Sequence, residues 1–98
     1  MGRLTPELNN ALAALRREAG LTQGELARAA DVSRQTISSI EQGAYNPSTS
    51  LTLRLSVVLG FPVERLFSLP DPAVRDLVHR REELKKEHEV DAEHAHDS

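Results

Sequence analysis

Apolar residues recur at helical spacing along the first two thirds of the chain, in short runs separated by turn-forming residues. The pattern predicts helices over residues 6–18, 23–30 and 34–42. The first begins after the N-cap Thr5, with proline as its first residue, and Gly20 ends it. We expect it to bury Leu8, Ala11, Leu12 and Leu15.

The second and third predicted helices are separated by a very short turn. Thr22 and Glu25 form a capping-box pattern, which predicts a helix that begins at Gln23. Asp31 tolerates the left-handed backbone of a tight turn and predicts the end of that helix. Ser33 is then the expected N-cap of the next helix. The residues buried by the helix that begins at Gln23 should be Leu26, Ala27 and Ala30.

Residues 34–42, placed at about 100° per step, divide into two faces. Ile37 and Ile40 lie on the inward face. The outward face carries Gln35, Ser38, Ser39 and Gln42, with Arg34 at its exposed N-terminal edge. A solvated surface helix is one interpretation, since outward faces are usually polar. The other is a DNA-reading face, because Arg, Gln and Ser match base edges and the turn has helix-turn-helix length.

The following segment allows two interpretations. Gly43 fits the left-handed position after a helix, and Pro47 excludes helix before Ser48. Residues 50–57 alternate polar and apolar side chains, which favours a strand, whereas the same region also contains a helical stripe of Leu51, Leu55, Val58 and Leu59. A short helix over residues 62–67 should then close the core with Phe61, Val63, Leu66 and Phe67.

Two prolines in residues 69–72 predict a boundary between a domain of residues 1–69 and a segment of residues 70–98. A helix over about residues 72–88 carries an apolar stripe of Val74, Leu77, Val78 and Leu84. This stripe is too short, and too interrupted by Arg81, to hold a coiled coil alone. The helix therefore needs a partner surface, either its own domain or the same helix of a second subunit. The polar and acidic residues 89–98 are expected to be a disordered tail.

Composition narrows the class of protein. A chain of 98 residues with two Phe, one Tyr and no Trp fits one small domain filled by aliphatic side chains. It has no cysteine and no apolar run of membrane-spanning length, so we expect a cytoplasmic protein without membrane contact. The irregular spacing of His88, His94 and His96 disfavours a metal site, and we predict no metal and no cofactor.

Two stretches, LTQGELARAADVSRQTISSIEQGAYNPS and VVLGFPVERLF, resemble the Xre/Cro-like helix-turn-helix regulators, the group of the phage lambda-type repressors. The resemblance covers roughly Leu8 to Phe67. It implies an all-α fold, with a five-helix lambda repressor-like domain followed by the C-terminal helix and acidic tail. It also favours a helix, capped by Ser48 and ended by Gly60, where periodicity alone leans toward a strand. Inward positions of that helix that are commonly Leu or Ala in the family fall near Thr49, Thr52 and Ser56 here.

The resemblance also implies roles for individual residues. Base contacts would be made by Arg34, Gln35, Ser38 and Ser39. Phosphate contacts would come from Gln23, Thr36, Gln42, Tyr45 and Asn46, although Tyr45 could equally be a core aromatic. Arg16 and Glu41 would form a structural ion pair.

The leading hypothesis is a regulator that binds double-stranded DNA as a homodimer on a roughly palindromic site, with a repressor role. The alternative is an antitoxin-type or other interaction protein that holds a protein partner through residues 71–98. An enzyme is disfavoured, because the sequence contains no phosphate-binding glycine loop, nucleophile motif or paired catalytic carboxylates.

The net charge of −3 is unusual for a DNA-binding protein, but it is unevenly distributed. Residues 1–70 carry seven Arg and six acidic groups, net +1, and residues 71–98 carry five basic and nine acidic groups, net −4. Phosphates would therefore be held largely by backbone N–H groups and neutral side chains.

We accordingly predict a shallow salt dependence of DNA binding. Two to four ionic phosphate contacts per half-site would give a slope of log K against log salt concentration of about −2 to −4 per half-site. Titrations of a specific duplex at several salt concentrations measure this slope, and a much steeper one would contradict the inferred use of neutral donors.

Overall fold

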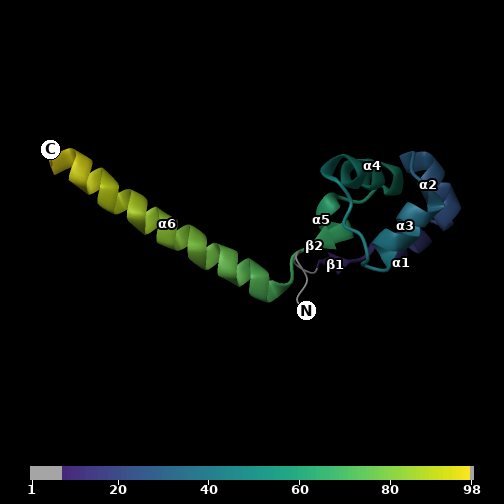
Figure 1. Ribbon diagram of the computed structural model, residues 1–98, viewed down its shortest axis with the longest axis horizontal. Helices are drawn as coiled ribbons and strands as arrows, with labels where there is room; N and C mark the ends of the chain where they lie inside the picture. The colour runs from purple at the N-terminus through teal and green to yellow at the C-terminus, as the bar shows by residue number, and fades with distance from the viewer. Residues whose placement is uncertain (1–7, 98) are drawn as a thin grey trace. The chain divides into compact units, whose positions relative to one another are not determined.

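The computed structural model describes residues 8–97, which fall into two units that divide after Ser68. The first unit contains five helices and a pair of two-residue strands (Figure 1). In chain order these elements are β1 (Asn9–Asn10), α1 (Leu12–Glu18), α2 (Gln23–Ala30), α3 (Arg34–Glu41), α4 (Thr49–Leu59), α5 (Val63–Leu66) and β2 (Phe67–Ser68). The second unit consists of α6 (Asp71–Asp97).

Side-chain caps fix where α2 and α3 begin. The Thr22 hydroxyl accepts a hydrogen bond from the Glu25 N–H at 3.1 Å, and the Glu25 carboxylate accepts one from the Thr22 N–H at 2.8 Å. These bonds to Thr22 lower the pKa of Glu25. Asp31 ends α2 with φ 59°, and the Ser33 hydroxyl accepts from the Thr36 N–H at 3.0 Å. The predicted capping box, left-handed turn and second N-cap are therefore confirmed.

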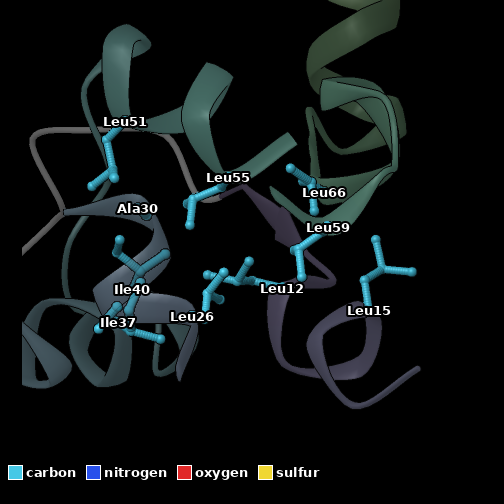
Figure 2. Packing of buried hydrophobic residues seen from close by; sticks show 11 residues of the cluster. Leu12, Leu15, Leu26, Ala30, Ile37, Ile40, Leu51, Leu55, Leu59 and Leu66 are labelled. Atoms are coloured by element: carbon cyan, nitrogen blue, oxygen red, sulfur yellow. The ribbon is translucent and has the colours of Figure 1, made fainter. Parts of the chain in front are cut away.

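A single apolar core is formed by the helices of the first unit (Figure 2). Buried side chains from α1, α2, α3, α4 and α5 meet there, as Figure 2 shows for the labelled residues. The largest fully buried ones are Leu12, Leu26, Ile37, Ile40, Leu55 and Leu66. Phe61 and Phe67 pack against this cluster but remain partly exposed. Aliphatic side chains thus fill the core, as the scarcity of aromatics predicts.

The ambiguous segment after Ser48 is a helix, α4. The Ser48 hydroxyl accepts from the Leu51 N–H at 3.1 Å, and Gly60 ends the helix with φ 76°. The half-buried Ser56 hydroxyl donates a hydrogen bond to the Phe61 carbonyl at 2.6 Å. This bond gives the hydroxyl a partner at a position where the family resemblance implies Leu or Ala. Thr49 is exposed, so its predicted inward position is wrong.

The first predicted helix is too long at its N-terminal end. It was expected to begin at Pro6, but α1 begins at Leu12, and Asn9 and Asn10 pair antiparallel with Ser68 and Phe67. The Asn10 carboxamide oxygen accepts from the Leu12 N–H at 3.0 Å, which favours a helix start there. The same pairing places Phe67 in β2, so α5 ends at Leu66. The predicted Thr5 cap lies outside the described residues.

α6 is longer than predicted. It continues to Asp97, whereas the sequence interpretation ended it near residue 88 and expected a disordered tail. The difference has a local reason: residues 73–97 contain no Gly or Pro and are rich in Glu, Lys, Arg and Ala, which favour helix. The exposed side chains of His79 and Glu83 lie one helical turn apart, with Nε2 and Oε1 separated by 3.2 Å, and their contact also favours the helix. Of the helices within residues 8–97, none is long and apolar enough to cross a membrane.

Candidate nucleic-acid interface

α3 separates a buried face from an open one. Ile37 and Ile40 are fully buried, whereas Arg34 and Gln35 are exposed at the start of the helix. Ser38 and Ser39 are half-buried on the same outward side, and Gln42, the C-cap, is exposed. The face predicted from helical periodicity is therefore a surface of the first unit.

Hydrogen bonds along α3 orient two of its amide side chains. Gln35 donates from its Nε2 to the Ser39 hydroxyl at 3.3 Å, and Gln42 donates from its Nε2 to the Ser38 hydroxyl at 3.1 Å. Each bond spans four residues, the spacing at which helical side chains are neighbours. A carboxamide that gives one N–H to a serine keeps its oxygen and its other N–H for a ligand. Both glutamines can therefore still offer a donor and an acceptor.

Two surface hollows are lined jointly by residues of α3 and of neighbouring segments. The first is lined by Gln23 of α2 together with Arg34, Gln35 and Ser38. Three expected base contacts are therefore brought together with an expected phosphate contact. The second hollow is lined by Gln35, Thr36, Ser39, Ala44 and Tyr45.

The remaining predicted phosphate contacts differ in their surroundings. The Thr36 hydroxyl lies 2.8 Å from the Ser33 hydroxyl, so it already takes part in the cap of α3. Tyr45 is 46% exposed, which excludes the core-aromatic interpretation. Asn46 is exposed in the loop after α3.

An ion pair between α1 and α3 lies beside this surface. Arg16 donates from Nε to Glu41 Oε2 at 2.6 Å and from Nη2 to Oε1 at 3.2 Å, and the two side chains are 10% and 7% exposed. Arg16 Nη1 also donates to the Leu21 carbonyl at 2.8 Å, and Gln23 Nε2 donates to Glu41 Oε1 at 3.0 Å. The expected partners Arg16 and Glu41 are thus in contact, and they also hold the loop before α2 and the Gln23 side chain.

The electrostatics of the pair follow from these contacts. Burial would raise the pKa of Glu41, but hydrogen bonds from Arg16 and Gln23 and the nearby positive charge outweigh it, so the pKa lies below its usual range. The hydrogen bond to Glu41 raises the pKa of Arg16 in turn. Both groups therefore remain charged at neutral pH.

Sequence reasoning missed the contribution of Asn10. Its Nδ2 donates to the Ile40 carbonyl at 2.6 Å, which ties the start of α1 to the last turn of α3. The local signal that could have indicated it is an Asn just before an apolar helical run, a common helix-start residue. Asn10 thus supports the orientation of α3 through a hydrogen bond to its backbone.

Two short helices joined at a left-handed Asp31, with the second exposing a polar face, define a helix-turn-helix module. The family model described as "Helix-turn-helix domain" matches residues 7–68. The chain is 43% identical over 61 residues to an uncharacterized HTH-type transcriptional regulator of Methanothermobacter thermautotrophicus, covering 61% of this chain and 88% of the relative. The chain therefore belongs to the helix-turn-helix family of transcriptional regulators, which is not a family of enzymes.

Other similarities agree with this assignment. The chain is 33% identical over 64 residues to the uncharacterized HTH-type transcriptional regulator YgzD of Bacillus subtilis, covering 65% of this chain and 97% of the relative. Among solved structures, the clp gene regulator ClgR from C. glutamicum superposes with a TM-score of 0.53 at 34% identity, over 56% of this chain and 71% of that one.

Among the side chains that the structure describes, no three His, Asp or Glu residues gather as a metal site. Of the histidines considered as ligands, His88 is exposed on α6, and the side chains of His94 and His96 lie outside the described part.

The ion pair predicts a specific loss of stability. Glu41→Gln removes the charge that neutralises the nearly buried Arg16, so the free energy of unfolding should fall by about 3 to 5 kcal/mol at neutral pH. Chemical denaturation monitored by circular dichroism measures it. Glu18→Gln, on the exposed end of α1, is the matched control and should change stability little.

The pH dependence follows from the same pair. Because the pKa of Glu41 is lower in the folded than in the unfolded state, its stabilisation is present above about pH 5 and is lost as the pH falls through the folded value. Wild type should therefore lose stability on acidification more steeply than Glu41→Gln. Parallel curves for the two proteins between neutral and acid pH would contradict the role assigned to the pair.

Proposed function

We propose that this chain is a sequence-specific transcriptional regulator that binds double-stranded DNA through the outward face of α3. The observation that carries the proposal is the exposure of Arg34 and Gln35 at the beginning of a helix whose opposite face is fully buried. In a helix-turn-helix module the first residues of the second helix are those that reach base edges in the major groove. The names of its relatives as transcriptional regulators support the same assignment.

In this proposal, bases are read by Arg34, Gln35, Ser38 and Ser39. Arg34 can donate two parallel hydrogen bonds to guanine O6 and N7, and Gln35 can pair with adenine N6 and N7. Ser38 and Ser39 accept hydrogen bonds from glutamines of the same helix, which gives those amides defined directions before DNA arrives. A side chain oriented in advance loses less conformational entropy on binding.

Phosphates are contacted by polar groups around this face. The Gln23 amide is fixed by Glu41 at the N-terminal end of α2, where backbone N–H groups and the helix dipole favour an anion. Gln42, Tyr45 and Asn46 follow α3 and are exposed, so they can reach the strand beside the groove. Thr36 would contact phosphate from the capped start of α3. Such neutral contacts fit the small positive charge of residues 1–70.

The protein would act in the cytoplasm, at the nucleoid, as a homodimer on a palindromic operator. One α3 reads only a few base pairs, and two copies related by a two-fold axis double the site and present both helices about one helical turn apart. Occupation of an operator that overlaps a promoter would exclude polymerase, which is the basis for a repressor role.

Selection of bound duplexes from a random library tests this function directly. The proposal expects enrichment of two inverted half-sites. Recovery of unselected sequences at every round would contradict sequence-specific binding.

We predict distinct effects of substitutions in the two kinds of contact. Arg34→Ala and Gln35→Ala should each cost about 1 to 3 kcal/mol on the selected site and relax preference at single base pairs. Gln23→Ala should weaken binding to selected and random duplexes to a similar extent, because a phosphate contact carries no sequence information.

Fluorescence anisotropy with selected and scrambled duplexes separates the two outcomes. Arg17→Ala, on the exposed side of α1, is a control for the loss of one positive charge. If Arg34→Ala and Gln35→Ala weakened binding to both duplexes equally, base reading by α3 would be excluded.

A further inference from the structure

The surface of α6 contains an unexplained apolar stripe. Val74, Leu77, Val78 and Leu84 are 42%, 49%, 40% and 57% exposed, and all four belong to α6. Large aliphatic side chains repeated at helical spacing are typical of a helix that packs against a partner. The charges beside the stripe distinguish the two orientations in which a second copy of α6 could pair with it.

The spacing matches two turns of a coiled-coil seam. With Val74 and Arg81 at the a position of a heptad, Leu77 and Leu84 occupy the d position. The flanking positions beside d, called e, then hold Asp71, Val78 and Lys85. The flanking positions beside a, called g, hold Ala73, Arg80 and Glu87.

A parallel pair of α6 helices would bring like charges together. In that orientation each a residue faces its own copy, so Arg81 would meet Arg81 of the partner subunit in the seam. Each g residue would face the following e residue, so Arg80 would lie beside Lys85 of the partner subunit, twice by symmetry. Like charges at such positions oppose pairing.

An antiparallel pair resolves most of these conflicts. With the two-fold axis near residue 79, Val74 packs against Leu84 of the partner subunit, and the aliphatic stem of Arg81 lies over Leu77 of the partner subunit. The e positions of the two helices now face each other. Asp71 therefore meets Lys85 of the partner subunit, once on each side of the axis.

The centre of the antiparallel arrangement is also compatible with pairing. Val78 lies beside Val78 of the partner subunit and adds an apolar contact. One like-charged contact remains, between the two copies of Arg80, and the adjacent position facing it carries Asp76 of the partner subunit. The antiparallel arrangement thus has two attractive flanking pairs where the parallel one has two repulsive pairs.

We infer that α6 is the dimerisation helix and pairs antiparallel with α6 of a second copy through Val74, Leu77, Val78 and Leu84. This inference assigns an interface to the homodimer of the proposed function. It rests on the proposed function only for the biological role of that dimer. Since the seam is short, the dimer should be weak and depend on protein concentration. Two half-sites on one duplex would then strengthen it by mass action.

A charge reversal distinguishes the two orientations. Lys85→Glu breaks both Asp71–Lys85 pairs of the antiparallel dimer, so the dimer Kd should rise, by roughly 2- to 30-fold for two exposed pairs. In a parallel dimer the same change would replace the repulsion from Arg80 by attraction, and the Kd would fall. Lys86→Glu, with the same charge change on the outer side of α6, is the matched control and should leave the Kd within about twofold.

Sedimentation equilibrium of the full chain without DNA measures these constants, with circular dichroism to check that α6 stays helical. A lower or unchanged Kd for Lys85→Glu, or a wild-type chain that stays monomeric at the highest soluble concentration, would overturn the inference.

Cross-linking gives an independent geometric readout, because the chain contains no cysteine. Val78→Cys should be joined to its own copy by a short bismaleimide. Leu84→Cys should not, because its distance from the two-fold axis puts the two copies about 15 Å apart along the helices. The reverse result would establish a parallel pair and overturn the inference. Capture of a different protein by α6, with no cross-linked homodimer, would also overturn it.

The outcome is separable from that of the proposed function. Selection of inverted half-sites by a chain whose α6 fails these tests would leave DNA recognition standing and reject only this dimer. An α6 dimer that selects no DNA sequence would leave this dimer standing and reject sequence-specific DNA recognition.

Discussion

The nearly buried ion pair of Arg16 and Glu41 is the constraint on which the position of α3 depends. It connects α1 to the last turn of α3, and its free hydrogen-bonding groups hold the Leu21 carbonyl and the Gln23 side chain. The same interaction therefore fixes the helix that faces outward and a polar side chain at the start of α2. Asn10 adds a second connection through the Ile40 carbonyl. A short helix with only two fully buried side chains needs such connections to keep one orientation.

Features determined by neighbouring residues could be predicted from the sequence. The caps of α2, α3 and α4 depend on hydroxyls three residues from their N–H partners, and the outward face of α3 follows from periodicity alone. The start of α1 could not be predicted, because Asn9 and Asn10 pair with residues far along the chain. The role of Asn10 was missed for the same reason. For the candidate site, the residues of α3 were found by pattern, while the Arg16–Glu41 contact was expected only by resemblance.

The small positive charge of the first unit bears on how the protein would find its DNA site. The first unit has little positive charge, so the proposed recognition would depend more on oriented amides, hydroxyls and backbone N–H groups than on general attraction to DNA. In the proposed function, weak non-specific binding would follow. The regulator would then bind stably only where two half-sites lie together on one duplex. The weak α6 dimer inferred above would fit this behaviour.

Nuclear magnetic resonance of the labelled protein with its selected duplex tests the central claim most directly. The proposal predicts intermolecular contacts between side-chain protons of Arg34, Gln35, Ser38 and Ser39 and base protons that line the major groove. Contacts confined to α4 or α6, with the resonances of α3 unchanged on addition of DNA, would contradict it.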